Sequence, residues 1–262
     1  MRVVIGYCHP DMVHSIWHAS LVQLLRKENR RVAAVFGVRS GPKIDSARNQ
    51  IVAEFLKGNG THLLMVDTDM VLPPNTIERL LRADREIVGG LAFIGSFDGS
   101  HVRPNIVEAN VVDDKSYTLN PVWEYPQGLV EVDAIGAACM MVKREVFENM
   151  RLARGEDHPM PWFAHGVAGN VEIGEDIAFC LTARKMGYSV WCDTRLVVPH
   201  AKIRYIDDED YVESLAMADH PYYAERERVP IYQKAVNGDD SNLSNRQSGE
   251  ELPDEGQPGT DP

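Results

Sequence analysis

Short apolar runs alternate with helix-like segments from residue 2 to residue 93 of this 262-residue chain, and this alternation limits its fold more than any other feature. The apolar runs have the length and the aliphatic content of buried strands. They lie at residues 2–7, 32–38, 61–66 and 87–93. The helix-like segments lie at residues 12–26, 45–57 and 73–82. Strands that alternate with helices predict an α/β fold, in which a mostly parallel sheet is flanked by helices.

The pattern changes after residue 93. Residues 94–134 are rich in Asn, Asp and Pro and contain short β-like runs, which predict a small antiparallel portion. Residues 153–170 combine Gly, Pro, His and aromatic residues, and we expect them to form a mobile loop over a site. The remaining regular elements are expected as strands at 117–122, 128–132 and 189–192 and as helices at 143–150 and 174–187.

Composition divides the chain into three parts. The α/β pattern occupies residues 1–206, and residues 207–236 are interpreted as a helical or irregular extension. Residues 237–262 are polar and acidic, with almost nothing to bury, which predicts a disordered tail.

The formal net charge is −12, so the chain lacks the basic excess typical of nucleic-acid binders, and nucleic acid is not an expected partner. An acidic enzyme that binds phosphate groups often recruits a divalent cation, which gives the charge a second interpretation. No apolar run approaches the roughly 20 residues that span a bilayer, and the N-terminus lacks the apolar stretch of a signal peptide. We therefore expect no transmembrane segment.

Four cysteines are present, and none forms a CxxC pair, which argues against a zinc knuckle or a redox motif. Cys139 and Cys180 lie in apolar runs and are expected to be buried as small hydrophobic residues. This usage predicts a reducing compartment, the cytoplasm.

The strongest local signal is the sequence Leu-Leu-Met-Val-Asp-Thr-Asp at residues 63–69. An apolar strand here delivers two carboxylates, Asp67 and Asp69, to its C-terminal end, which is the edge of an open α/β sheet where ligands bind. Residues i and i+2 of a strand share a face, so both carboxylates are expected to reach one Mg²⁺ or Mn²⁺ ion. The alternative is that the pair only caps the following turn.

Three further groups carry chemistry with weaker signals. Glu175 and Asp176 begin a helix, where the helix dipole alone also favours acidic residues. His200 follows an apolar run and Pro199, although a lone histidine at a strand end is more often packed or solvated than a ligand. Arg48 and Asn49 lie in the first turns of a helix, where an arginine suits phosphate but also suits an exposed face.

Taken in this order, the motifs resemble those of the GT-A glycosyltransferases, in particular the family 2-like enzymes, including versions from bacteriophage and actinobacterial genomes. The resemblance extends from the N-terminal strand to about residue 206. It implies a GT-A catalytic domain over residues 1–206 that transfers a sugar from a nucleotide-diphosphate donor, UDP-sugar or GDP-sugar, to an acceptor hydroxyl. The implied acceptor is a glycan, a lipid-linked sugar or a protein.

The resemblance also assigns roles. It matches the DxD motif to residues 67–69, with Asp69 as the direct metal ligand, Asp67 beside it on the metal and the donor, and His200 completing a Mn²⁺ or Mg²⁺ site. It makes Asp176 the general base of an inverting enzyme, with Glu175 beside it to orient the acceptor.

Donor-binding residues are implied less uniformly. The resemblance places Arg48 and Asn49 against the donor nucleotide, together with Tyr7 at the end of the first strand and Arg39 at the end of the second. The acid that some family members carry after the second strand is absent here, because that region reads Phe-Gly-Val-Arg-Ser. The motif QxxRW of processive synthases is also absent.

Other classes of protein share parts of this pattern. A haloacid-dehalogenase-type phosphatase also carries DxD after an apolar strand, with Asp67 as the nucleophile, but tends to begin with that motif. A nucleotidyltransferase would carry a Gly-rich loop with a basic residue after the first strand, where this chain reads Tyr-Cys-His-Pro-Asp. A catalytically silent nucleotide-sugar-binding module is the non-enzymatic alternative, and it has less use for all four of Asp67, Asp69, Asp176 and His200.

Overall fold

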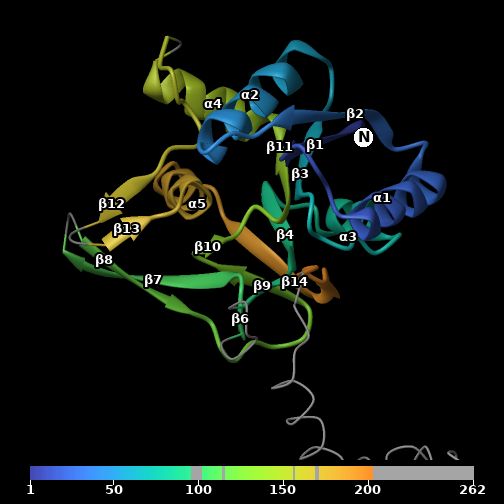
Figure 1. The fold of residues 1–262 in the computed structure, drawn as a ribbon. Coiled ribbons are helices and arrows are strands. Elements are labelled where there is room, and N and C mark those ends of the chain that lie inside the picture. Colours follow the sequence, from blue (N-terminus) through green and yellow to red (C-terminus); the bar gives the residue numbers. More distant parts are fainter. Residues whose placement is uncertain (96–101, 114–115, 156, 169–170, 203–262) are drawn as a thin grey trace, which may run out of the picture. The chain divides into compact units, whose positions relative to one another are not determined.

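The computed structural model describes residues 1–95, 102–113, 116–155, 157–168 and 171–202 (Figure 1). The chain divides into two compact units, Met1–Arg204 and Tyr205–Pro262. The second unit lies outside the described residues, and so do the extension predicted at 207–236 and the tail predicted at 237–262. The account below therefore concerns the first unit.

A seven-stranded sheet forms the centre of this unit, in the order β2-β1-β3-β11-β4-β14-β9. β1, β2, β3, β4 and β14 share one direction, as a mostly parallel sheet predicts, but β11 and β9 run against their neighbours, so the sheet is mixed. Its strands are β1 (Val3–His9), β2 (Val32–Arg39), β3 (His62–Asp67), β4 (Ile87–Leu91), β9 (Leu129–Val132), β11 (Cys139–Lys143) and β14 (Val190–Val197).

Helices cover both faces of the sheet, and each face has its own apolar core (Figure 1). On one face, Trp17, Leu24 and Leu80 pack from α1 and α3. On the other, Phe55 and Phe179 pack from α2 and α5, together with α4. The helices are α1 (Ser15–Glu28), α2 (Ile44–Lys57), α3 (Thr76–Ala83), α4 (Arg144–Arg154) and α5 (Glu175–Lys185). The alternation predicted from the sequence is confirmed.

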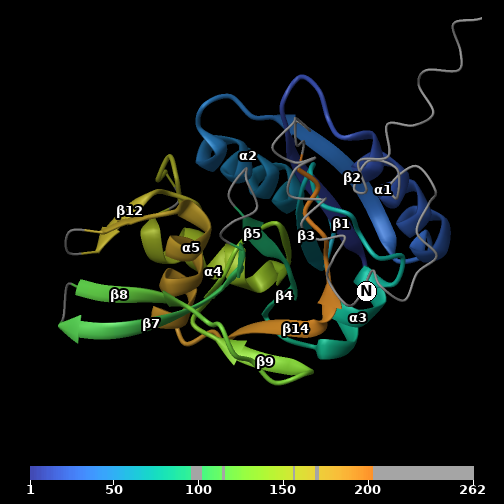
Figure 2. The ribbon, with the colours of Figure 1, turned by 60° about the horizontal axis from the view of Figure 1, so that its bottom comes forward.

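Three small antiparallel sheets add to the central one: β10-β7-β8, β12-β13 and β5-β6. The β7–β8 ribbon and β12 extend on the same side of the molecule as α5 (Figure 2). This is the antiparallel portion that the sequence predicted. Its strands are β5 (Phe93–Gly95), β6 (Val102–Pro104), β7 (Ile106–Asp113), β8 (Ser116–Pro121), β10 (Ala134–Ile135), β12 (Gly166–Ala168) and β13 (Val171–Ile173).

Residues 153–170 were expected to form a mobile loop, and this expectation is wrong for the middle of the segment. Trp162 and Phe163 are buried in the core on the α2 side of the sheet. The Phe163 ring stacks on Phe179 at a centroid distance of 4.7 Å, and the indole N–H of Trp162 donates to the backbone oxygen of Phe147. These contacts hold the segment against α4 and α5.

Two other expectations concern burial and membranes. All four cysteines are free and buried, and Cys139 and Cys180 have no exposed surface, which confirms the prediction for both. Among the described residues, no helix combines the length and the apolar character that crossing a membrane requires.

Candidate active site

The carboxylates of the DxD motif diverge because the strand ends at the first of them. Asp67 is the last residue of β3, and its backbone oxygen accepts from the N–H of Met70, which closes a tight turn over residues 67–70. The rule that residues i and i+2 share a face of a strand therefore no longer applies. Asp67 contacts Arg48, whereas Asp69 contacts His200. The two carboxylates therefore have different partners in this structure, and their sharing of one ion stays a prediction.

The turn after β3 is joined to the segment after β14. Val71 donates its N–H to the oxygen of Pro199, and Ala201 donates to the oxygen of Asp69 at 2.7 Å. An isolated bridge pairs Met70 with His200. These backbone contacts bring His200 beside Asp69, although the two residues are far apart in the sequence. The pairing of Asp69 with His200 that the sequence implied is therefore present in the structure.

His200 has the surroundings of a metal-binding histidine. Its Nδ1 lies 3.1 Å from the backbone oxygen of Phe93, and its Nε2 lies 2.7 Å from Oδ2 of Asp69. Metal-binding histidines commonly donate their other ring N–H to a carbonyl in this way.

The donor set of Asp69 and His200 fits a divalent cation such as Mn²⁺ or Mg²⁺. Two neighbouring ligands of an octahedral ion, each at about 2.1 Å, lie about 3 Å apart, which is close to the observed separation. Among the described residues, no group of three or more His, Cys, Asp or Glu side chains is gathered to hold a metal ion. Two protein ligands suffice for an ion that also binds water and substrate phosphates.

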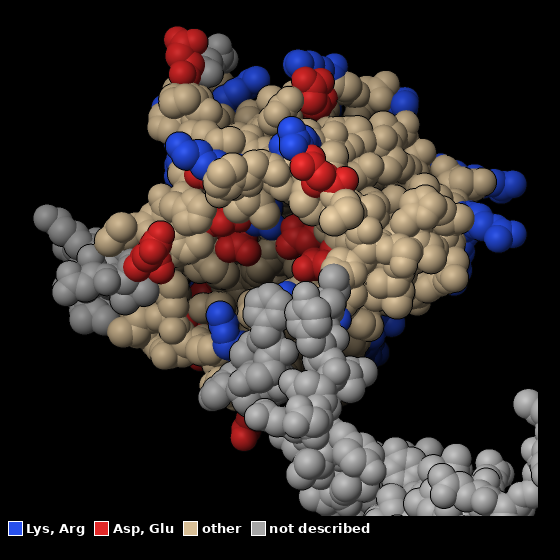
Figure 3. Space-filling view, viewed as in Figure 1, with Lys and Arg blue, Asp and Glu red and all other residues tan. Residues whose placement is uncertain are grey.

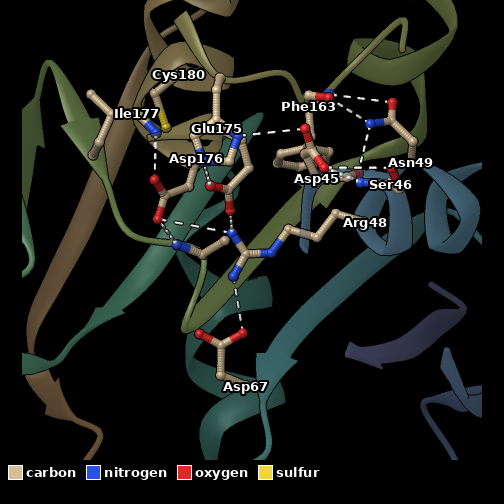
Figure 4. A network of polar contacts seen from close by, with 12 residues as sticks. Asp45, Ser46, Arg48, Asn49, Asp67, Phe163, Glu175, Asp176, Ile177 and Cys180 are labelled. Carbon is tan, nitrogen blue, oxygen red and sulfur yellow. Dashed lines mark hydrogen bonds and ion pairs between the residues drawn. The ribbon is translucent and has the colours of Figure 1, made fainter. Parts of the chain in front are cut away.

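Arg48 of α2 joins the two acidic motifs (Figure 4). Its Nη2 donates to Oδ1 of Asp67 at 3.0 Å, and its Nη1 donates to the carboxylate of Glu175. The Asp176 carboxylate lies 4.0 Å from the same Nη1. The guanidinium is buried, so one positive charge holds three carboxylates from β3 and α5 in a fixed arrangement.

The electrostatics of this cluster follow from burial and shared charge. Burial disfavours the positive charge of Arg48, but the surrounding carboxylates outweigh it and raise the pKa of the guanidinium. Burial raises the pKa of the Glu175 carboxyl above its ordinary value, and the opposing attraction of Arg48 does not cancel this effect. Burial also raises the pKa of the adjacent Cys8 thiol to about 11, which leaves it protonated and unreactive at neutral pH.

Asp176 is held at the N-terminal end of α5 with its carboxylate fixed by two backbone donors. Oδ1 accepts from its neighbour Ile177 at 2.8 Å, and Oδ2 accepts from the N–H of Ala137 at 3.2 Å. The helix dipole also favours a negative charge at this position. The carboxylate lines a cavity of about 350 Å³, whereas Glu175 does not. The two neighbouring acids therefore have different roles, one buried on Arg48 and one facing a space.

Arg48 and Asn49, which the sequence assigned to the donor, contact groups of the protein in this structure. The Asn49 amide uses both N–H groups on the backbone oxygens of Asp45 and Phe163. Its oxygen accepts from the N–H groups of Trp162 and Phe163. An amide has two donors and two lone pairs, so Asn49 has none left for a nucleotide. Arg48 is likewise occupied by carboxylates, and both side chains serve the architecture of the site.

Tyr7 and Arg39 lie at the C-terminal ends of β1 and β2. The Tyr7 ring packs against Trp17 with a centroid distance of 4.8 Å. Arg39 is exposed and pairs with Asp11 of the β1–α1 loop at 2.6 Å. The sheet register sets His9 opposite Arg39, so this corner combines aromatic rings with an ion pair. A donor-binding role for Tyr7 and Arg39 stays a prediction.

His165 belongs to the site and was missed in the sequence. Its Nδ1 lies 3.4 Å from Asp45, and its Nε2 lies 3.6 Å from Glu175. The imidazole thus bridges two carboxylates and links the buried Glu175 to the surface. The sequence around His165 does not indicate this role, because the histidine lies in an irregular segment and its partners come from α2 and α5.

Acidic side chains gather in a hollow of the face seen in Figure 3, with basic atoms among them. A bare hollow of this kind repels a diphosphate, and an added cation would offset the repulsion.

No family model and no curated protein sequence matches this chain. Solved structures do. GalNAc-T7, whose structure contains UDP, GalNAc and Mn²⁺, matches with a TM-score of 0.52 at 13% identity, over 76% of this chain and 43% of that one. A197 from STIV matches with a TM-score of 0.49 at 18% identity, over 79% and 87% of the two chains. CMP:2-keto-3-deoxy-manno-octonic acid synthetase with CTP matches with a TM-score of 0.40 at 11% identity, over 82% and 97%.

The match to GalNAc-T7 shows a shared fold. The chain has an α/β architecture similar to that of GalNAc-T7, with a mixed seven-stranded sheet flanked by helices. The chain spans less than half the length of GalNAc-T7, and the low identity carries no residue over from one protein to the other.

Proposed function

We propose that this chain is a glycosyltransferase that moves a sugar from a nucleotide-diphosphate donor, with the aid of a divalent metal ion, to an acceptor hydroxyl. The observation that carries the proposal is the pairing of Asp69 with His200 at the edge of the sheet that also holds Glu175 and Asp176. Arg48 joins the second acidic pair to the DxD motif through Asp67. Metal ligands and a candidate base thus border one site on a fold that nucleotide-sugar-using transferases share.

In this proposal, Asp69 and His200 hold the cation, and Asp67 stays on Arg48 until donor binds. The bound cation supplies positive charge where negative charge develops on the departing diphosphate. The acidic lining of the site makes that charge necessary, since the carboxylates would otherwise repel the donor. UDP-sugar is the favoured donor and GDP-sugar the alternative, as the resemblance implies.

Asp176 accepts the proton of the acceptor hydroxyl. The hydroxyl oxygen forms the new bond to the sugar carbon, and the bond from that carbon to the diphosphate breaks with its electron pair on the leaving group. Asp176 suits this role because its carboxylate faces a cavity and is fixed by two backbone donors. General-base removal costs about 10²- to 10⁴-fold in rate, so Asp176→Asn is expected to lose transfer while retaining donor affinity. Unchanged turnover would exclude Asp176 as the base.

The decisive experiment measures donor hydrolysis over UDP-, GDP- and dTDP-sugars, with and without Mn²⁺. The wild type is compared with Asp69→Ala and with Glu54→Ala, which removes an exposed carboxylate of α2 outside the site. We expect one nucleotide diphosphate to be released, only with Mn²⁺ and only when Asp69 is present. Pyrophosphate formation from a nucleoside triphosphate would favour a nucleotidyltransferase instead. No release and no metal-dependent nucleotide binding would refute the proposal.

A further inference from the structure

The cavity of about 350 Å³ beside Asp176 has walls of two kinds. Most of it is apolar, with side chains from β7, β8 and α5 such as Val107, Leu119 and Ile177. The charged side chains among the residues that line it are Arg103, Glu172 and Asp176. The cavity lies on the side of Asp176 formed by the small antiparallel sheets, and none of Arg48, Asp67 and Asp69 lines it.

Arg103 is a cation for which the described part of the chain supplies no ion pair. It is the middle residue of β6, and no ion pair joins it to any residue within the described ranges. The other arginine at the site, Arg48, is buried among three carboxylates. Arg103 is half-buried, so a charged ligand in the cavity would meet a partly desolvated guanidinium. Its planar fork of donors matches a carboxylate or a phosphate.

The charge balance of the cavity discriminates between those two anions. One arginine faces two carboxylates there, Glu172 and Asp176. A phosphate monoester with a charge near −2 adds more repulsion to these acids than a carboxylate with a charge of −1. A monoanion is therefore the better match for a single guanidinium in this setting.

The volume limits the size of the ligand. Small-molecule sites span about 300–1,000 Å³, and this cavity is at the lower end of that range. It holds about one ring, whose apolar face can lie on Val107 and Leu119 while its hydroxyl reaches Asp176.

We propose that the acceptor bound in this cavity is a hydroxylated acid about the size of one sugar ring. Arg103 binds its carboxylate. The class is that of sugar acids and similar hydroxy acids, as single molecules or as the terminal unit of a longer glycan. The role as acceptor rests on the proposed function, whereas the binding of the acid by Arg103 does not. The two statements can therefore fail separately.

The test is a binding titration by saturation-transfer NMR with three probes: methyl glucuronide, methyl glucoside and methyl glucoside 6-phosphate. The full-length wild type is compared with Arg103→Gln, Arg103→Lys and the matched control Arg82→Gln, which alters an exposed arginine of α3 outside this cavity. We expect the glucuronide to bind the wild type about tenfold or more tightly than the glucoside, which is the usual worth of a charge-assisted hydrogen bond. Arg103→Gln removes this preference, Arg103→Lys keeps part of it, and Arg82→Gln keeps it in full.

Three results would overturn the inference. They are equal binding of glucuronide and glucoside to the wild type, a preference that survives Arg103→Gln, and no binding of any probe. Tighter binding of the phosphate would overturn the choice of a monoanion. Arg103-dependent binding of the acid by a protein that never releases nucleotide diphosphate from any donor would retain the cavity assignment and refute the transferase. Release of nucleotide diphosphate from a donor, without a preference for acids in the cavity, would retain the transferase and refute the cavity assignment.

Discussion

A single buried guanidinium, that of Arg48, lies within 4.0 Å of three carboxylates from two distant parts of the chain. The cluster still carries an excess of negative charge. Burial is the main cause of the raised pKa of Glu175, and the neighbouring Asp176 adds to it. Such a network positions the acids at both ends of the site. Any substitution that removes the central guanidinium is therefore expected to lower the free energy of unfolding strongly.

Arg48→Met is expected to lower the free energy of unfolding by about 3–5 kcal/mol, because it removes the buried guanidinium that donates to Asp67 and to the buried Glu175. Urea denaturation measures this loss. Adding Glu175→Gln to the variant removes one of the uncompensated charges and should recover part of the stability. Arg48→Lys is expected to recover only part, because an ammonium lacks the fork that contacts Asp67 and Glu175 together.

The matched control is Arg82→Met, which removes an exposed arginine paired with Glu78 one helical turn away. Surface pairs of this kind contribute at most about 1 kcal/mol. Equal losses for Arg48→Met and Arg82→Met would show that the buried network contributes nothing beyond an ordinary surface pair.

Individual residues differed in how well the sequence predicted them. The resemblance, and not the residues alone, paired Asp69 with His200, and the two side chains meet where the ends of two parallel strands reach one edge of the sheet. Arg48 and Asn49 were assigned to the donor, since an arginine and an asparagine at a helix start resemble ligand-binding residues. Their partners are carboxylates and backbone groups, of which Glu175 and Phe163 lie more than 100 residues away, and no local pattern encodes such distant contacts.

At the scale of elements, β11 explains the largest difference between the expected and the observed sheet. The chain leaves β4, forms the small antiparallel sheets and returns to insert β11 between β3 and β4. No strand was predicted for residues 139–143, and its place and direction in the sheet could not be read from the sequence, because pairing is a long-range choice. The insertion brings the backbone oxygen of Ala138 to the N–H of Asp67, which donates to it. It also brings the N–H of Ala137 to the Asp176 carboxylate, to which that N–H donates.

The start of β3 allows a prediction about pH. The His62 imidazole is nearly fully buried, and burial, together with the neighbouring Lys143, lowers its pKa below the ordinary 6.5. The unfolded chain therefore takes up a proton near pH 6.5 that the folded chain resists, so stability is lost as the pH falls below that value. From pH 7.5 to 5.5, the wild type should lose up to about 1 kcal/mol more than His62→Gln does.

Denaturation curves at several pH values measure this difference. His18→Gln is the control, since His18 is exposed on α1 and should follow the wild type throughout. If the wild type and His62→Gln lose stability in parallel over this range, His62 does not resist protonation in the folded state.

For the molecule as a whole, the proposed cation should act as a ligand of the folded state. An ion that binds only the native chain stabilises it by about 2.7 kcal/mol at a concentration of about 100 times Kd. For a folded unit of this size, that free energy corresponds to a rise in Tm of roughly 5–10 °C. Mn²⁺ alone should produce the rise without any nucleotide, because Asp69 and His200 are already paired in the fold.

Asp69→Ala and His200→Ala should each remove most of this rise, and the double variant should lose little more than either single one, since both side chains serve one ion. Differential scanning fluorimetry with and without Mn²⁺ provides the measurement, and His18→Ala keeps the full rise as the matched histidine control. A rise that persists in the double variant would place the cation elsewhere on this acidic surface. The net charge of −12 attracts any cation weakly, and the experiment therefore distinguishes this weak, unspecific attraction from binding at a specific site at the sheet edge.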